Sequence, residues 1–168
     1  MKSIILAVAT ALTLTSSYAF SAETTTDIEP IRNDYGYAGF GLGPFPLIVP
    51  VFSAGYRTQH GHHGADVFGS VSTLVFVTQL KAAAQYLYYF QPDLSSQFYA
   101  GGGLGVSTLF KKNAYVSPEL VFGKQYTTDK GETRFLQAQI SFPTFRCAPH
   151  THRPFYMPLV VISYGIGF

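Results

Sequence analysis

The positions that follow residue 34 alternate between apolar and polar side chains with a period of two, which is the pattern of half-buried β-strands. Clusters of turn-forming residues interrupt this pattern. The predicted turns are Pro44 to Pro50, His60 to Gly64, Thr78-Gln79, Pro92 to Ser96, Lys111 to Asn113, Thr128 to Gly131 and Pro143 to Pro158. They separate eight predicted strands at residues 35–43, 50–59, 65–77, 80–91, 97–109, 114–126, 132–142 and 159–168. Most have about the 9–11 residues that a tilted strand needs to cross a bilayer.

Successive side chains of a strand point to opposite faces, so each predicted strand can be divided into two faces. The last strand has an apolar face made of Val160, Ile162, Tyr164, Ile166 and Phe168, opposite Ser163, Gly165 and Gly167. The strands that begin at residues 50, 80, 114 and 132 divide in the same way, whereas residues 65–77 are apolar on both faces. We therefore predict an all-β fold, an eight-stranded antiparallel up-and-down barrel.

An internal similarity supports the number of strands. The segment 37–43, Tyr-Ala-Gly-Phe-Gly-Leu-Gly, is similar to the segment 99–105, Tyr-Ala-Gly-Gly-Gly-Leu-Gly. The spacing corresponds to four strands with their connections, as in a barrel of two similar halves; chance similarity between glycine-rich strands is the alternative. The glycines on the face of Tyr37 and Tyr99 suit a crowded interior. A phosphate-binding glycine loop is disfavoured because a strand, not a helix, follows.

The alternation alone does not distinguish a transmembrane barrel from a soluble one, which would have its apolar face inside. Composition favours the membrane, because 16% of the chain is aromatic and only 12% is charged, about half the charged fraction of soluble domains. Tyr and Phe lie near strand ends on the apolar face, as in an interfacial girdle. The opposite face carries too few charges for a solvated exterior. The printed sequence also ends within a strand, on Phe168.

The first residues have the layout of a secretory signal peptide. Lys2 precedes an apolar run at residues 4–14, and small residues follow up to Ala22. This run is shorter than the roughly 20 apolar residues of a membrane-spanning helix. We therefore expect a signal peptide at residues 1–22, with cleavage near residues 19–22, a flexible polar leader at 23–34 and the barrel at 35–168.

The final strand resembles a known export signal. The pattern Val160-x-Ile162-x-Tyr164-x-Ile166-x-Phe168 is similar to the C-terminal signal of bacterial outer-membrane β-barrel proteins, which the barrel-assembly machinery recognises. With eight strands, the chain resembles the small OmpA/OmpX-type barrels, and its glycine-rich strands and histidine-containing turn look like small outer-membrane proteins of chlamydia-like bacteria. The resemblance implies the outer membrane of a Gram-negative-type bacterium, contact with its lipids, and both chain ends in the periplasm.

A small set of polar residues is expected inside the barrel, whose interior is just wide enough for its own side chains. These are Arg57, Lys81, Gln85, Glu119, Gln137 and Gln139. A buried charge needs a partner, so Glu119 is expected to offset Arg57 or Lys81 in a closed hydrogen-bonding network. A proton or solute path through the same residues is the alternative.

The histidines and the single cysteine form two groups. His60, His62 and His63 occupy one predicted turn, and the last connection contains Arg146, Cys147, His150, His152 and Arg153. Such residues are plausible metal ligands, but the topology puts the groups at opposite ends of the barrel, so we expect polar turns, no metal and no cofactor. The basic residues of the last connection are candidates for contact with lipopolysaccharide phosphates or a protein partner, the alternative being a cap over the barrel mouth.

The sequence therefore predicts a non-enzymatic integral outer-membrane protein with a structural or surface-interaction role and without an open pore. The net charge of +2 gives no support for nucleic-acid binding. Two alternatives remain: a soluble exported ligand-binding barrel like a lipocalin, and a lipid A-modifying barrel enzyme. The enzyme is disfavoured because no His-x-Ser pair occurs in the chain, and Ser70 and Ser72 have no suitably spaced histidine.

Overall fold

A computed structural model describes residues 32–43, 48–74, 77–109, 113–128, 132–142, 145–146 and 158–168. The predicted signal peptide and most of the predicted leader lie outside these residues. Within the described part of the chain, no helix is long and apolar enough to span a membrane.

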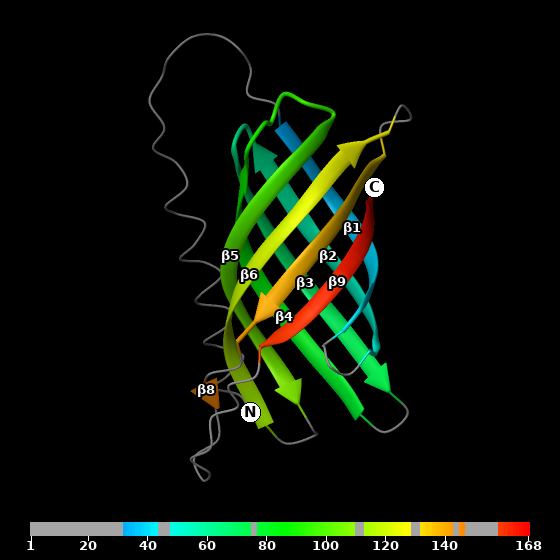
Figure 1. Cartoon of the computed structure of the whole chain (residues 1–168), viewed down its shortest axis with the longest axis vertical. Coiled ribbons are helices and arrows are strands. Elements are labelled where there is room, and N and C mark those ends of the chain that lie inside the picture. The colour runs from blue at the N-terminus through cyan, green and yellow to red at the C-terminus, as the bar shows by residue number, and fades with distance from the viewer. Residues whose placement is uncertain are drawn as a thin grey trace.

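Eight long strands form a closed antiparallel barrel (Figure 1). They are β1 Arg32–Leu42, β2 Pro50–His60, β3 His63–Leu74, β4 Val77–Tyr89, β5 Ser96–Leu109, β6 Asn113–Thr127, β7 Thr133–Ser141 and β9 Leu159–Gly167. Each strand from β1 to β6 pairs with its successor, β7 pairs with β9, and β9 pairs with β1 to close the barrel. A two-residue strand, β8 (Phe145–Arg146), pairs with the first part of β6. The prediction of an eight-stranded up-and-down barrel is confirmed.

The clearest differences from the predicted strands lie in three places, and the other strand ends move by up to three residues. Thr78 and Gln79, predicted as a turn, lie in β4 and pair with Thr73 and Ser72 of β3. Threonine is a good strand former, so a short polar pair was a poor turn signal here. The strand β1 begins at Arg32, inside the segment predicted as leader. The short β8 lies within the last predicted connection.

The two ends of the barrel differ in the elements that they carry. At the terminal end, β1 begins and β9 ends, and the backbone amide of Phe168 donates to the carbonyl of Gly36 over 2.9 Å. The opposite end carries β8 and is called the β8 end. At the terminal end a two-residue turn, Gly61-His62, joins β2 to β3. Gly61 has a φ of 56°, in the left-handed region that favours glycine.

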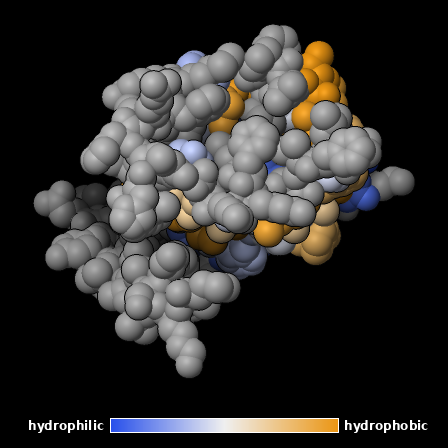
Figure 2. Space-filling model, turned by 90° about the horizontal axis from the view of Figure 1, so that it is seen from below, coloured by the Kyte–Doolittle hydropathy of each residue, from blue (hydrophilic) through white to orange (hydrophobic). Residues whose placement is uncertain are grey.

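The outer face of the wall is apolar. Large hydrophobic side chains are exposed on all eight long strands, among them Phe40, Phe52, Val67, Leu80, Leu104, Leu120, Leu136 and Ile162. Figure 2, a view from the β8 end, shows apolar side chains (orange) on the outer side of the wall. The inner face instead carries polar side chains, aromatic rings and glycines. The apolar surface of this barrel therefore faces outward.

Aromatic rings inside the barrel pack directly over glycines of neighbouring strands. A Cβ atom added at Gly165 would lie 2.1 Å from the ring of Phe135, and one at Gly123 would lie 2.5 Å from the ring of Tyr99. Tyr37 covers Gly55 in the same way, at 2.8 Å. These glycines are required because any larger residue would collide with a ring.

Candidate functional site

The half of the interior nearer the terminal end is built around Arg57. Its side chain is fully buried and forms an ion pair with Asp66, with 2.6 Å between Nη2 and Oδ2. The register produces this pair, since Arg57 of β2 and Asp66 of β3 lie directly opposite each other. The same Nη2 donates to Oε1 of Gln137 over 2.8 Å.

Three aromatic rings enclose the guanidinium of Arg57. Its Cζ lies 4.3 Å from the ring centre of Phe135, 4.8 Å from that of Tyr99 and 5.5 Å from that of Tyr37. Nε and Nη1 have no hydrogen-bond partner among the described residues, so the ring faces supply their favourable electrostatic surroundings. We call Arg57, Asp66, Gln137, Tyr37, Tyr99 and Phe135 the arginine cluster.

The tyrosines of the arginine cluster also fix its polar groups. The hydroxyl of Tyr37 donates to Oδ1 of Asp66 over 3.0 Å, and that of Tyr99 donates to Oε1 of Gln137 over 2.8 Å. Asp66 therefore accepts from two sides. The hydroxyl groups that orient Asp66 and Gln137 therefore belong to side chains that are themselves buried.

Closer to the terminal end, three buried glutamines form a continuous chain. Gln125 accepts from the hydroxyls of Tyr35 (2.7 Å) and Tyr89 (3.3 Å) and donates to Gln59 over 3.2 Å. Gln59 donates to Oε1 of Gln97 over 2.8 Å, and Gln97 donates to the carbonyl of Pro92 over 2.8 Å. With the arginine cluster, these side chains fill this half of the barrel.

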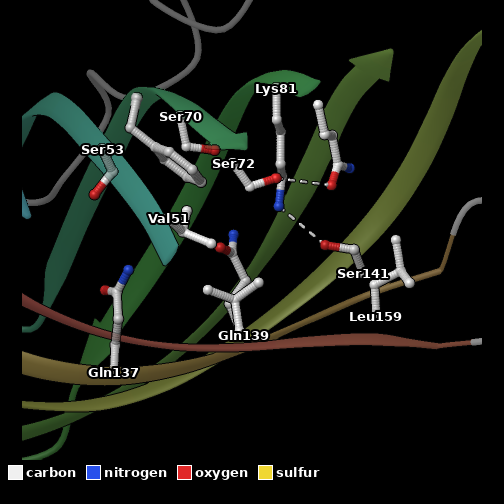
Figure 3. A pocket seen from close by; sticks show the side chains of 12 residues that line it. Val51, Ser53, Ser70, Ser72, Lys81, Gln137, Gln139, Ser141 and Leu159 are labelled. Atoms are coloured by element: carbon white, nitrogen blue, oxygen red, sulfur yellow. Dashed lines mark hydrogen bonds between the residues drawn. The ribbon is translucent and has the colours of Figure 1, made fainter. Parts of the chain in front are cut away.

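The half nearer the β8 end is built around Lys81 and Glu119. Nζ of Lys81 lies 2.6 Å from Oε1 of Glu119. It also donates to Ser141 over 2.9 Å (Figure 3). Glu119 also accepts from Gln85 (2.9 Å), Gln139 (2.7 Å) and Ser141 (3.2 Å). We call these five residues the lysine cluster.

A cavity of about 30 Å³ lies beside the lysine cluster. Figure 3 shows Ser53, Ser70 and Ser72 on one side of this cavity and Gln137, Gln139 and Ser141 on the other. The volume suffices for one or two water molecules, and the lining offers the polar partners that a buried water needs.

All six residues predicted to line the interior lie inside the barrel, but in two separate clusters. Arg57 and Gln137 belong to the arginine cluster, and the rest belong to the lysine cluster: Lys81, Gln85, Glu119 and Gln139. Of the two cations suggested for Glu119, the structure pairs it with Lys81. Sequence reasoning missed Asp66, the partner of Arg57. Val67 and Val71 lie on the outer face of β3, so Asp66 must face inward. A carboxylate within a predicted strand was the signal that could have identified it.

The three histidines predicted to share one turn lie at the terminal end, but of these only His62 is in the turn, because His60 ends β2 and His63 begins β3. Nδ1 of His62 is 2.8 Å from the carbonyl oxygen of Tyr89, and Nδ1 of His63 is hydrogen-bonded to the hydroxyl of Tyr86. The described residues contain no group of three or more side chains suited to hold a metal. In the last connection, Arg146 lies in β8, paired with Tyr115. Cys147, His150, His152 and Arg153 lie outside the described residues.

The five apolar residues of the predicted assembly signal lie along β9 and its end. Ile162, Ile166 and Phe168 are exposed, and Val160 and Tyr164 are half-buried. Of the residues between them, Ser163, Gly165 and Gly167 are buried inside the barrel, and Val161 is half-buried. The last strand thus presents its apolar positions on the outer face of the wall.

Comparison with known proteins supports the fold. No family model matches the chain, and no curated protein matches it. Among solved structures, the crystal structure of Neisserial surface protein A is similar, with a TM-score of 0.56 and 12% sequence identity over 81% of this chain and 95% of that chain. The chain therefore has the architecture of the OmpA/OmpX-type outer-membrane barrels.

Proposed function

We propose that this chain is an integral outer-membrane protein with a non-enzymatic, structural or surface-interaction role. The observation that carries this proposal is the orientation of its two faces. The outer wall exposes side chains such as Leu104 (63%) and Leu120 (56%), whereas Arg57, Asp66 and Glu119 are buried inside. A lipocalin-like barrel in water would have the reverse arrangement, so the faces favour lipid over water outside.

The distribution of outward charges and tyrosines supports a membrane boundary at the terminal end. The outward-facing tyrosines, Tyr56, Tyr86, Tyr88, Tyr126 and Tyr164, lie within about four residues of that end of their strands, as in an interfacial girdle. Asp34, Lys124 and Arg134, charged residues of outward parity, also lie near this end. The wall between this end and the β8 end is apolar, as a hydrocarbon-spanning band requires.

Cell fractionation tests the location. We expect the protein in the outer-membrane fraction, with faster migration of unheated samples on a denaturing gel. Recovery in the soluble periplasm would contradict the membrane proposal and favour a soluble ligand-binding barrel. Unchanged lipid A mass spectra on overexpression are expected, and a modified lipid A would favour the enzyme alternative.

The interior packing supports a closed barrel rather than a pore. The arginine cluster and the glutamine chain fill the half nearer the terminal end, and Tyr89, Tyr99, Leu87 and Arg57 are fully buried there. We expect the purified protein to give no stable conductance steps in planar lipid bilayers. Reproducible single-channel steps would instead favour the solute-path alternative.

Phe168 and the alternating residues before it are proposed as the contact for the barrel-assembly machinery. Phe168 is 85% exposed, so deleting its side chain removes little packing within the barrel. We predict that Phe168→Ala lowers the amount of assembled protein in cells much more than it lowers stability after refolding in detergent. Heat-modifiable migration measures both quantities. Equal amounts of assembled wild type and variant in cells would contradict this role.

The last connection is proposed as the surface-contact region, with Arg146, Cys147, His150, His152 and Arg153 facing lipopolysaccharide or a protein partner. Labelling Cys147 in intact cells with a membrane-impermeant thiol reagent tests the proposed orientation. Labelling that occurs only after the outer membrane is permeabilised would place this connection in the periplasm and contradict the proposal.

A further inference from the structure

The outer wall carries one polar cluster on β6, β7 and β9 near the terminal end. Arg134 has outward parity in β7, where the next outward positions are Leu136, Ala138 and Ile140. In the register, Arg134 lies opposite Tyr126 of β6 and Ile166 of β9. Arg134 is the second residue of β7, at the proposed membrane boundary, where lipid headgroups are within reach of a guanidinium.

Two tyrosines approach each other across the strand that carries Arg134. The hydroxyls of Tyr126 and Tyr164 are 3.4 Å apart, although their strands, β6 and β9, are the two neighbours of β7. Their phenol groups therefore meet over β7. The wall thus offers two hydroxyls and a guanidinium in one place, a set of donors that suits an oxyanion.

Arg134 already has one ion-pair partner, Glu132, but its guanidinium has further N–H donors. Nη2 of Arg134 donates to Oε2 of Glu132 over 3.0 Å, but the two side chains are 38% and 46% exposed. Exposed pairs of this kind contribute little. Nε of Arg134 is buried and has no hydrogen-bond partner among the described residues. Lys124 of β6 is directed away from this cluster, since its Nζ lies 5.1 Å from the ring centre of Phe98 on β5.

We propose that Arg134, Tyr126 and Tyr164 bind the phosphate of a phospholipid headgroup at the terminal end of the barrel. Arginine is suited to this because its planar fork matches phosphate geometry. The proposal rests on the membrane location proposed above. A lipid, rather than free phosphate, is favoured because exposed Leu136 (53%) and Ile166 (43%) lie beside the cluster and would contact acyl chains.

Lipid retention by the refolded full chain tests the site. The protein is titrated in detergent micelles with phosphatidylglycerol, and bound lipid is counted by native mass spectrometry. We expect Arg134→Gln to weaken retention on the order of tenfold, equivalent to about 1.4 kcal/mol, and Arg134→Lys to weaken it less. His60→Gln, a change at an exposed residue of the same end on β2, is the matched control and should retain lipid as the wild type does.

Two further results would overturn the assignment. Unchanged lipid retention in a folded Arg134→Gln variant would show that Arg134 does not bind a headgroup phosphate. Displacement of the lipid by millimolar inorganic phosphate would make it a site for free anions instead. Failure of the membrane proposal is distinguishable, because the wild type would then neither insert into vesicles nor show heat-modifiable migration, whatever the Arg134 variants do.

Discussion

The two halves of the barrel interior each contain a buried ion pair, but they are filled in different ways. Around Arg57 the space is occupied by aromatic rings, and the cation contacts three of them within 5.5 Å. Around Lys81 a cavity of about 30 Å³ remains, lined by serines, glutamines and a few apolar side chains. Among these is Phe68, whose ring centre lies 5.5 Å from Nζ. One half is therefore packed by several rings over glycines, whereas the other combines small polar groups with a single ring near its cation.

This difference has consequences for how each charge is compensated. Asp66 accepts from Arg57 and from Tyr37, and both groups are buried. Glu119 accepts from three further donors besides Lys81 and lies next to a cavity that has room for water. The lysine cluster can therefore lose its cation with less harm than the arginine cluster can. Substitutions at matched positions in the two halves test this asymmetry.

The largest effect is expected from removing the two cations in turn. Arg57→Met leaves the carboxylate of Asp66 buried with Tyr37 as its remaining donor among the described residues, and should lower the free energy of unfolding by about 3–5 kcal/mol. Lys81→Met leaves Glu119 with three donors and should cost about 1.5–3 kcal/mol. Urea unfolding in detergent or lipid vesicles measures both.

A double variant separates charge from packing in this experiment. Removing Asp66 as well, in Arg57→Met/Asp66→Asn, should recover part of the stability because no uncompensated charge remains. Equal losses of stability for Arg57→Met and Lys81→Met would instead show that the two halves compensate their charges equally well.

A smaller effect is expected from adding one methyl group to each half. Gly165→Ala places a Cβ 2.1 Å from the ring of Phe135 and should cost roughly 1–3 kcal/mol through overpacking. Ser70→Thr adds a methyl beside the cavity and should change stability by less than about 1 kcal/mol. Gly69→Ala controls for the backbone effect of losing a glycine, because its new Cβ would come no closer than 3.8 Å to the carbonyl oxygen of Lys81. A harmless Gly165→Ala would refute the packing argument.

Much of the barrel could be predicted from the sequence because the two faces of its wall differ in polarity. A strand with an apolar outer face and a polar inner face must alternate. This alternation, together with the turn signals, predicted the strands to within a few residues. The turn at Thr78-Gln79 was wrong because polar strand residues resemble turn residues when the interior is polar. Parity alone then placed Arg57, Lys81 and Glu119 inside.

The pairing inside the barrel could not be predicted in the same way. Which inward side chains meet across the interior depends on the stagger of the strands, and alternation contains no information about stagger. Arg57 of β2 meets Phe135 of β7 and Tyr99 of β5, strands that are not its neighbours. Asp66 was missed for a local reason, since Phe68 on its face made β3 look apolar on both sides.

The smallest effect is expected from removing one hydroxyl group in each half. Tyr99→Phe removes the hydroxyl that donates to Gln137 over 2.8 Å and should lower the free energy of unfolding by about 1 kcal/mol. Ser117→Ala, two residues from Glu119 on the inner face of β6, removes a buried hydroxyl that has no hydrogen-bond partner among the described residues. Its loss should leave stability unchanged or slightly raised, because no partner is left unsatisfied. Urea unfolding under the same conditions measures both variants. A loss for Ser117→Ala as large as that for Tyr99→Phe would show that water in the β8 half bonds this hydroxyl, so that both halves are equally satisfied.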